Sequence, residues 1–172
     1  AGLGDWNMVW ERRAKPGDTF LIHAGLYKPE RLNYVDPMMA PFDGSMSLTL
    51  KGTEDRPISF KAAGDGEPIF DGDGNHRLFD VMASAYHIFD GLTIRNTNVA
   101  IFAGQKEVLG AVGLTVRNCR FENVGVGVWT EYAGSSDFYI ADNLFLGRED
   151  RGRLVGWTGP MWASAGPAVD NT

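Results

Sequence analysis

The stretch VRNCRF at residues 116–121 recurs further along the chain, in altered form, as IADNLF at residues 140–145. Both stretches place an apolar residue first, an Asn or Asp third and a Phe last. A looser copy, IFDGLTI, lies at residues 88–94, and a fainter one, ISFKA, lies at residues 58–62. Self-similarity with a period of roughly 20 to 50 residues is typical of solenoids, propellers and other repeat arrays.

Each copy alternates apolar and polar residues over a few positions and is followed closely by Gly, Asn or Asp, which is the pattern of a short β-strand and a turn. A propeller blade needs roughly 40 residues for its four strands, which is too long for the interval from Val116 to Ile140. The sequence therefore predicts an all-β protein, a right-handed parallel β-helix (solenoid) with coils of roughly 22–28 residues and irregular loops. A β-sandwich whose strands happen to resemble one another is the alternative.

Asp90, Asn118 and Asp142 occupy what reads as the same place in their copies, just before a turn. An Asx side chain can bond the backbone two residues on and tolerates left-handed torsion angles, so it suits a sharp bend. We expect stacked Asx residues to bond one another from coil to coil. The alternative is that Asp90 and Asp142 form a catalytic carboxylate pair.

The chain of 172 residues contains 22 glycines, and its length suits a single domain. Recognisable coils cover residues 14–147, and residues 148–172 form an irregular segment that could lead into further coils. The chain begins on Ala rather than Met, and we expect it to be a portion of a longer β-helix. Unpaired strands at the ends of such a solenoid favour self-association or continuation there.

Net charge and hydropathy argue against a nucleic-acid partner and against a membrane span. The formal charge of −6 argues against nucleic acid, which would require a basic patch. No run of about 18 apolar residues is present, so we expect no membrane span. The single cysteine, Cys119, cannot form an internal disulfide and is expected to be a buried small residue.

Several of these segments resemble the pectin-lyase-like right-handed parallel β-helix family. The similar segments are PGDT at residues 16–19, AGLY at 24–27, PISFKAAG at 57–64 and NCRFEN at 118–123, and the resemblance covers residues 14–147. It implies the β-helix fold, a polysaccharide partner and a secreted, periplasmic or cell-surface location. The family includes lyases, hydrolases, epimerases and non-enzymatic members, and none of its catalytic residues can be placed on a matching position here.

Two functions follow from this resemblance. The first is a polysaccharide lyase or glycoside hydrolase, since the long face of a β-helix can hold several sugars of a polysaccharide, including a uronate-containing one. The second is a non-catalytic structural or adhesive module of a surface protein, fibre or assembly. For the first, the substrate-binding candidates lie near the end of the repeats: Trp129, Glu131, Tyr132, Arg148, Asp150 and Trp157. Each could instead belong to a solvated corner with aromatic residues packed under a loop.

The segment DGDGN at residues 71–75 resembles the start of a calcium loop, with Asp71, Asp73 and Asn75 as oxygen ligands. The rest of an EF-hand pattern is missing, because the sixth position is His76 and the twelfth is Met82. A Gly-rich turn is the favoured interpretation, with Ca²⁺ as the one cofactor the sequence suggests. His23, in an alternating strand, is interpreted as a hydrogen-bonded or surface imidazole rather than a catalytic one.

Overall fold

The structure of the protein is a computed structural model that describes residues 14–30, 44–106, 108–147 and 168–170. Within these ranges the chain is all-β and contains no helix, including none long and apolar enough to cross a membrane. The strands are β1 (Thr19–Ile22), β2 (Gly25–Tyr27), β3 (Met46–Ser47), β4 (Ile58–Ala62), β5 (Pro68–Asp80), β6 (His87–Asp90), β7 (Thr93–Gln105), β8 (Leu109–Gly110), β9 (Thr115–Arg117), β10 (Arg120–Thr130), β11 (Tyr139–Ala141), β12 (Leu144–Leu146) and β13 (Ala168–Asp170).

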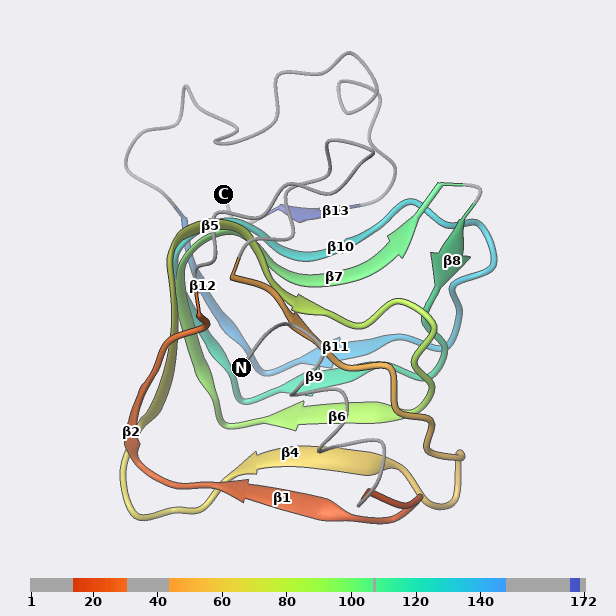
Figure 1. The fold of residues 1–172 in the computed structure, drawn as a ribbon, viewed down its shortest axis with the longest axis horizontal. Helices are drawn as coiled ribbons and strands as arrows, with labels where there is room; N and C mark the ends of the chain where they lie inside the picture. The colour runs from red at the N-terminus through yellow and green to blue at the C-terminus, as the bar shows by residue number, and fades with distance from the viewer. Residues whose placement is uncertain (1–13, 31–43, 107, 148–167, 171–172) are drawn as a thin grey trace.

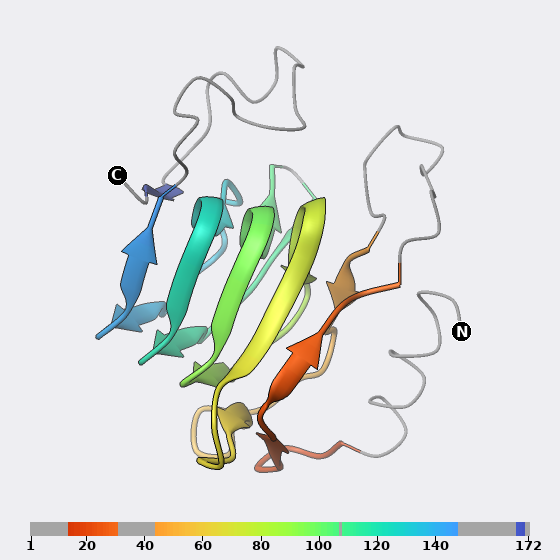
Figure 2. The same cartoon turned by 90° about the vertical axis from the view of Figure 1, so that its left-hand side faces the viewer.

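The strands form two mainly parallel sheets that the chain visits in turn (Figure 1). Sheet A has the order β1-β4-β6-β9-β11, and the main path of sheet B has the order β12-β10-β7-β5-β2. Each passage through sheet A and then sheet B, here called a lap, adds one strand to each sheet. The curved strands β5, β7 and β10 lie side by side in the middle of sheet B (Figure 2). The short strands β8 and β13 pair antiparallel with β7 and β10.

The pairing of β11 with β9 confirms that the two most similar repeats are successive parallel strands. Ile140 is the register partner of Val116, and Tyr139 is the partner of Thr115. The preceding laps, from Ile88 to Thr115 and from Ser59 to Ile88, are only slightly longer than the lap from Thr115 to Tyr139. The first lap, from Thr19 to Ser59, is longer than the others because it also includes residues 31–43.

The predicted alignment of the third copy was wrong by one residue. Phe89, not Ile88, is the register partner of Val116. A shift of one residue exchanges the two faces of a strand, and it is Phe89 that is fully buried. The aromatic side chain therefore selects the register, because it fills the interior between the sheets.

The same shift changes which residue makes the turn. Gly91 rather than Asp90 stands level with Asn118 and Asp142, and the φ angles of these three are +75°, +52° and +56°. Left-handed torsions of this kind favour Gly, Asn and Asp. Asp90 lies one residue earlier and accepts hydrogen bonds from Arg117 and from the Asn118 amide, which is 2.9 Å away.

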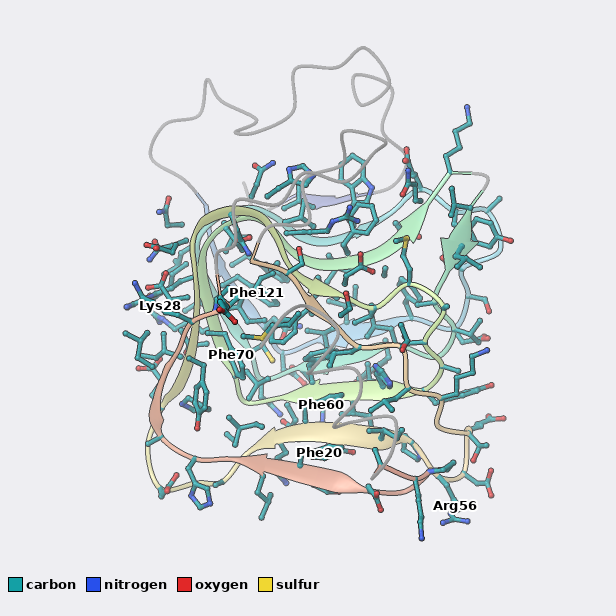
Figure 3. The ribbon with its side chains drawn as sticks, viewed as in Figure 1. Phe20, Lys28, Arg56, Phe60, Phe70 and Phe121 are labelled. Atoms are coloured by element: carbon teal, nitrogen blue, oxygen red, sulfur yellow. The ribbon has the colours of Figure 1, made fainter. Side chains whose placement is uncertain are left out.

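The interior consists of side-chain columns that run from lap to lap. The first column follows the register of sheet A and contains Phe20, Phe60, Phe89, Val116 and Ile140. The second follows sheet B and contains Tyr27, Phe70, Ile94, Phe121 and Phe145. Neighbouring rings stack at centroid distances from 4.6 to 5.3 Å, because adjacent strands are about 4.8 Å apart. Phe70 and Phe121 lie in the space between the sheets (Figure 3).

Cys119 lies in this core, as predicted. Burial raises the pKa of its thiol to about 11, so the group is neutral at physiological pH. The thiol therefore behaves as a small packing group.

Asn96 and Asn123 make the bends within β7 and β10, at φ angles of +53° and +50°. The Asn123 amide donates to Asn96 Oδ1 at 2.9 Å, and the Asn96 amide donates to Asp71 at 3.0 Å. These bonds connect three laps. The predicted kind of bond between Asx side chains of neighbouring laps joins Asn118 to Asp90, and it recurs here at a bend that the repeat alignment did not single out.

Replacing Asn123 by Ala is expected to lower the free energy of unfolding by about 1–2 kcal/mol, because Ala is disfavoured at positive φ and the ladder bond is lost. Asn123→Gly keeps the torsion accessible and loses only the bond, so it should cost less than the Ala variant. Urea unfolding of the three proteins measures both effects. Equal stability of the Ala variant and the native chain would contradict this role.

Candidate functional site

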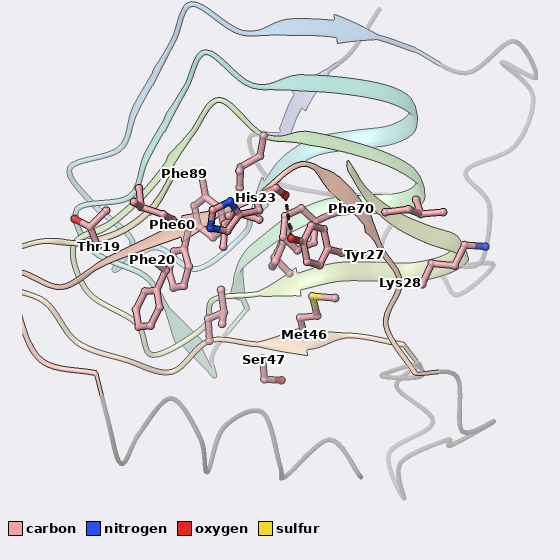
Figure 4. Close-up of a pocket in the computed structure, with 16 residues that line it drawn as sticks. Thr19, Phe20, His23, Tyr27, Lys28, Met46, Ser47, Phe60, Phe70 and Phe89 are labelled. Atoms are coloured by element: carbon pink, nitrogen blue, oxygen red, sulfur yellow. Dashed lines mark hydrogen bonds between the residues drawn. The ribbon is translucent and has the colours of Figure 1, made fainter. Parts of the chain in front are cut away.

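The first lap surrounds a cavity of about 660 Å³ between β1, β2 and β3 and the inner residues of the following strands (Figure 4). Small-molecule sites in proteins are typically about 300–1,000 Å³ and mostly apolar. Its apolar walls include Phe20, Ile22, Leu26, Tyr27, Met46, Leu48, Phe60, Phe70, Phe79, Phe89 and Leu92. Four polar residues also line it: Thr19, His23, Lys28 and Ser47.

The aromatic walls follow directly from the two core columns. Phe20 stacks on Phe60 at 5.3 Å, and Tyr27 stacks on Phe70 at 5.0 Å. Both columns begin in this lap, so the cavity has aromatic faces on two sides. Flat apolar surfaces of this kind can pack against the face of a ring-shaped ligand.

One of these polar residues, His23, forms a hydrogen-bonded pair with a carboxylate. His23 Nδ1 is 2.7 Å from Asp65 Oδ2, and Asp65 Oδ1 accepts the Ala24 N–H at 3.0 Å. The hydrogen bond from His23 and then the Ala24 N–H lower the pKa of Asp65, so this group is a carboxylate. The side chains of His23 and Asp65 are 72% and 50% exposed, which leaves the pair open to solvent.

The pair forms because the chain bends at the same place in two successive laps. His23 lies between β1 and β2, and Asp65 lies between β4 and β5. The two bends touch at Gly66, where a Cβ atom would come within 2.8 Å of the Ala24 Cβ. Gly66 also has a φ of +141°, which L side chains rarely adopt. Glycine at this position therefore lets the two bends approach closely enough for the pair.

Two further polar side chains, those of Tyr27 and Lys28, follow His23 closely in the sequence. The Tyr27 hydroxyl donates to the His23 carbonyl at 2.9 Å and holds the backbone of the histidine. Lys28 lines the cavity, and its ammonium lies 3.6 Å from the Asp73 carboxylate in a pair that is about half exposed on both sides. Such exposed pairs contribute little energy, so Lys28 can exchange this partner for an anionic ligand.

The predicted aromatic and acidic candidates lie elsewhere. Trp129 is 6% exposed and packs with Val99, Phe102 and Val126 in an apolar cluster apart from the main core. Glu131 accepts the Lys106 N–H at 3.4 Å. Trp129 therefore has a packing role, and Glu131 has a role in the structure of the loop. A sugar platform at Trp129 gains no support from this burial.

Tyr132 also has a packing role. A Cβ at Gly110 would lie 2.5 Å from the Tyr132 ring, and one at Gly134 would meet the same ring at 2.5 Å. The tyrosine therefore covers glycine backbone at this corner. The remaining candidates, Arg148, Asp150 and Trp157, lie outside the described residues.

A buried charge cluster that sequence reasoning missed lies on β5. Arg77 Nη1 is 3.1 Å from Asp80 Oδ2, and the Arg77 guanidinium lies 4.3 Å from the centre of the Phe102 ring. Burial raises the pKa of Asp80, against the opposing effect of Arg77. Burial also lowers the pKa of the neighbouring His76 to about 4. The cluster is buried and its charged groups do not line the first-lap cavity, so we assign it a structural role.

The suggested calcium residues already have protein partners. Asp71 accepts the Asp73 N–H at 2.9 Å and the Arg95 Nε–H at 2.8 Å. Asn75 Oδ1 accepts the Thr97 hydroxyl at 2.5 Å. The Gly-rich segment is a bulge inside β5 rather than a turn between coils. Across the described ranges no three His, Cys, Asp or Glu side chains gather to hold a metal ion.

The same partners also set the pKa of the Asp71 carboxyl. Burial raises this pKa, but hydrogen bonds from Asp73, Asn96 and Arg95 lower it by more. Asp90 is similar: burial raises its pKa, and Asn118 and Arg117 lower it by more. Arg117 lies on β9, the strand between those that carry or precede Asp90 and Asp142, so it separates the two carboxylates of the alternative catalytic pair.

No protein-family model, curated protein or solved structure matches the chain. Its function is therefore inferred from the first-lap cavity and the polar residues that line it.

Proposed function

We propose that the chain is a right-handed parallel β-helix that binds or acts on an extracellular polysaccharide, and that the first-lap cavity holds one sugar unit of that polymer. The lap-by-lap register of parallel strands supports the β-helix. The cavity supports a saccharide ligand because it combines aromatic faces with a few polar groups, which is how proteins orient a ring that has an apolar face and polar substituents.

One observation carries the proposal: His23, which is hydrogen-bonded to the Asp65 carboxylate, and Lys28 are both among the residues that line the aromatic-walled cavity. The rings offer packing for the sugar face. The Lys28 ammonium offers a charge-assisted hydrogen bond to a uronate carboxylate. His23 offers a proton acceptor or donor. These groups favour an acidic polysaccharide over a neutral one.

Binding of the 172-residue protein to pectate, alginate and a glycosaminoglycan tests this directly, with a neutral glucan as comparison and with and without Ca²⁺. We expect binding to at least one polyuronate. Lys28→Met should weaken it about tenfold, the value of one hydrogen bond to a charged group. The exposed Lys51, outside the cavity, provides the matched variant Lys51→Met, which should bind like the native chain. No binding to any acidic polymer would refute the proposal.

A non-catalytic structural or adhesive module is the second candidate, and the outer strand faces favour it. Asp71 pairs with Arg95 at 2.8 Å, and Asp90 pairs with Arg117 at 3.0 Å, each across neighbouring laps. These carboxylates therefore join laps rather than remain available for acid–base chemistry. Binding without any new reducing end or unsaturated sugar would favour this second function.

A further inference from the structure

We propose that copies of the protein associate head to tail, with β12 of one copy pairing in parallel with β2 of the next, so that the stack of laps continues from one molecule into another. This association requires no polysaccharide, so it goes beyond the proposed function and is independent of it. Three features of sheet B support it: two open strand edges, complementary backbone groups at those edges, and exposed leucines beside them.

Sheet B ends in an open strand at both of its edges. Among the described strands, β12 pairs only with β10 and β2 pairs only with β5, and the two lie at opposite ends of the sheet (Figure 2). At the β12 end, β13 pairs with a different part of β10, at Val126 and Trp129. The unpaired N–H and C=O groups of an open edge are a template for a strand of another chain.

The hydrogen bonds of β12 show which of its backbone groups face outward. Leu144 donates its N–H to the Cys119 carbonyl at 2.9 Å, on the side of β10. Backbone groups alternate in direction along a strand, so the N–H and C=O of Phe145 point away from β10 and toward the open edge.

The backbone of β2 presents the complementary groups. Gly25 donates its N–H to the Glu67 carbonyl at 3.2 Å, so the N–H and C=O of Leu26 point away from the next lap. In parallel strands a donor meets the carbonyl one residue before its register partner. Placing Phe145 opposite Tyr27 of a second copy therefore brings the Phe145 N–H to the Leu26 carbonyl.

The same register continues the aromatic column of sheet B. Phe121 and Phe145 stack at 4.6 Å at one end, and Tyr27 and Phe70 stack at 5.0 Å at the other. Tyr27 and Phe145 are only half-buried, whereas Phe70 and Phe121 are buried. A Phe145 ring against the Tyr27 ring of the next copy would repeat the contact that already joins the laps within one chain.

The outward side chains fit this register as well. Leu144 would lie beside Leu26 of the next copy, and these leucines are 46% and 55% exposed. Between them, the same outward row passes through Ile69, Thr93 and Arg120. Joining two copies therefore places Leu144, Leu26 and Ile69 next to one another and removes exposed apolar surface from water.

The two surfaces of such a contact are different, which determines the kind of assembly. A head-to-tail contact leaves one free edge at each end of the pair, so further copies can add and the interface does not close into a symmetric dimer. The mean size of the assembly should therefore rise steadily with protein concentration.

Sedimentation velocity of the full chain at increasing concentration tests the association. Leu144→Lys should weaken it about tenfold or more, because a buried leucine contributes at least that factor and a lysine protects a strand edge. Leu109→Lys is the matched control, since Leu109 is 48% exposed on β8, away from both edges, and it should associate like the native chain. Thermal unfolding confirms that each variant is folded.

Cysteine cross-linking tests the register. Leu26→Cys and Leu144→Cys are made separately, each with Cys119→Ser so that only one thiol is present. Register partners about 4.8 Å apart are within disulfide range, so mixing the two proteins should give a linked dimer that neither gives alone. Leu144→Cys that cross-links to itself as readily as to Leu26→Cys would indicate a two-fold contact and overturn the head-to-tail pairing.

The remaining outcomes are equally decisive. A protein that stays monomeric at every concentration, with no dimer from the mixed cysteine variants, would overturn the proposal, as would a Leu144→Lys variant that associates like the native chain. Leu26 and Tyr27 also line the first-lap cavity, so association is measured without polysaccharide. Its failure would leave the proposed function in place.

Discussion

Lowering the pH from 7 to 4 is expected to remove about 3 kcal/mol of folding stability through His87 alone. His87 is fully buried, with its ring edge-on to Phe60 at 5.5 Å, and neither ring nitrogen has a hydrogen-bond partner of good geometry. Burial lowers the pKa of the imidazole from 6.5 to about 4, with a small opposing effect of the Leu50 backbone. Between these two pKa values the unfolded chain therefore binds a proton on His87 and the folded chain does not.

The sign and size follow from proton linkage. Stability falls as the pH drops through 6.5, because only the unfolded state is then protonated, and the loss levels off near pH 4, where the folded state also takes up the proton. Each pH unit between these limits is worth about 1.4 kcal/mol, which gives the total of about 3 kcal/mol.

Urea unfolding of the native chain and of His87→Leu at pH 7 and pH 4.5 measures this effect. The carboxylates and His76, whose pKa burial also lowers, titrate in both proteins. The difference between the two pH dependences therefore isolates His87. The native chain should lose more stability than the variant, by about 2 kcal/mol over this interval. Identical losses in both proteins would contradict the buried, neutral imidazole.

Replacing Phe89 by Ala should lower the free energy of unfolding by about 3–5 kcal/mol, the usual range for a buried Phe. Phe89 has no exposed surface and lies 5.3 Å from Phe60 and 5.2 Å from Phe79, so the cavity left behind has rigid aromatic walls. Phe145 gives the matched comparison because it is half-buried on the last described lap and stacks on Phe121.

Phe145→Ala should cost less than half as much as Phe89→Ala, since less apolar surface is lost. Chemical unfolding of the two variants measures the ratio. Equal costs would mean that burial does not increase from the last lap toward the middle of the stack.

The parallel pairing of the repeats could be predicted because it follows from a similarity between short stretches of the sequence. Val116 and Ile140 start two similar stretches, and similar stretches pack in equivalent places. The register of the third copy could not be predicted, since both Ile88 and Phe89 are apolar and Asp90 and Gly91 both suit a turn. Only the size of the interior decides between them, and Phe89 fills it.

The pair of His23 and Asp65 could not be predicted for a different reason. His23 was interpreted as a hydrogen-bonded or surface imidazole, and it is both, but its partner Asp65 is 42 residues away. That separation depends on the length of the first lap, which has no repeat to reveal it. Trp129 was predicted to lie on a binding surface because it is an aromatic residue near acidic ones. It is buried instead, and this burial depends on contacts made only in the folded chain.

Disulfide cross-linking between β9 and β11 tests the central claim, that successive laps pair in parallel. Cys119 is replaced by Ser so that the introduced cysteines are the only ones. Thr115 and Tyr139 are register partners, and parallel neighbours about 4.8 Å apart are within disulfide range. Thr115→Cys with Tyr139→Cys should therefore cross-link readily, whereas Thr115→Cys with Ala141→Cys should not. A cross-link to position 141 and none to position 139 would indicate antiparallel strands and contradict the stacked laps.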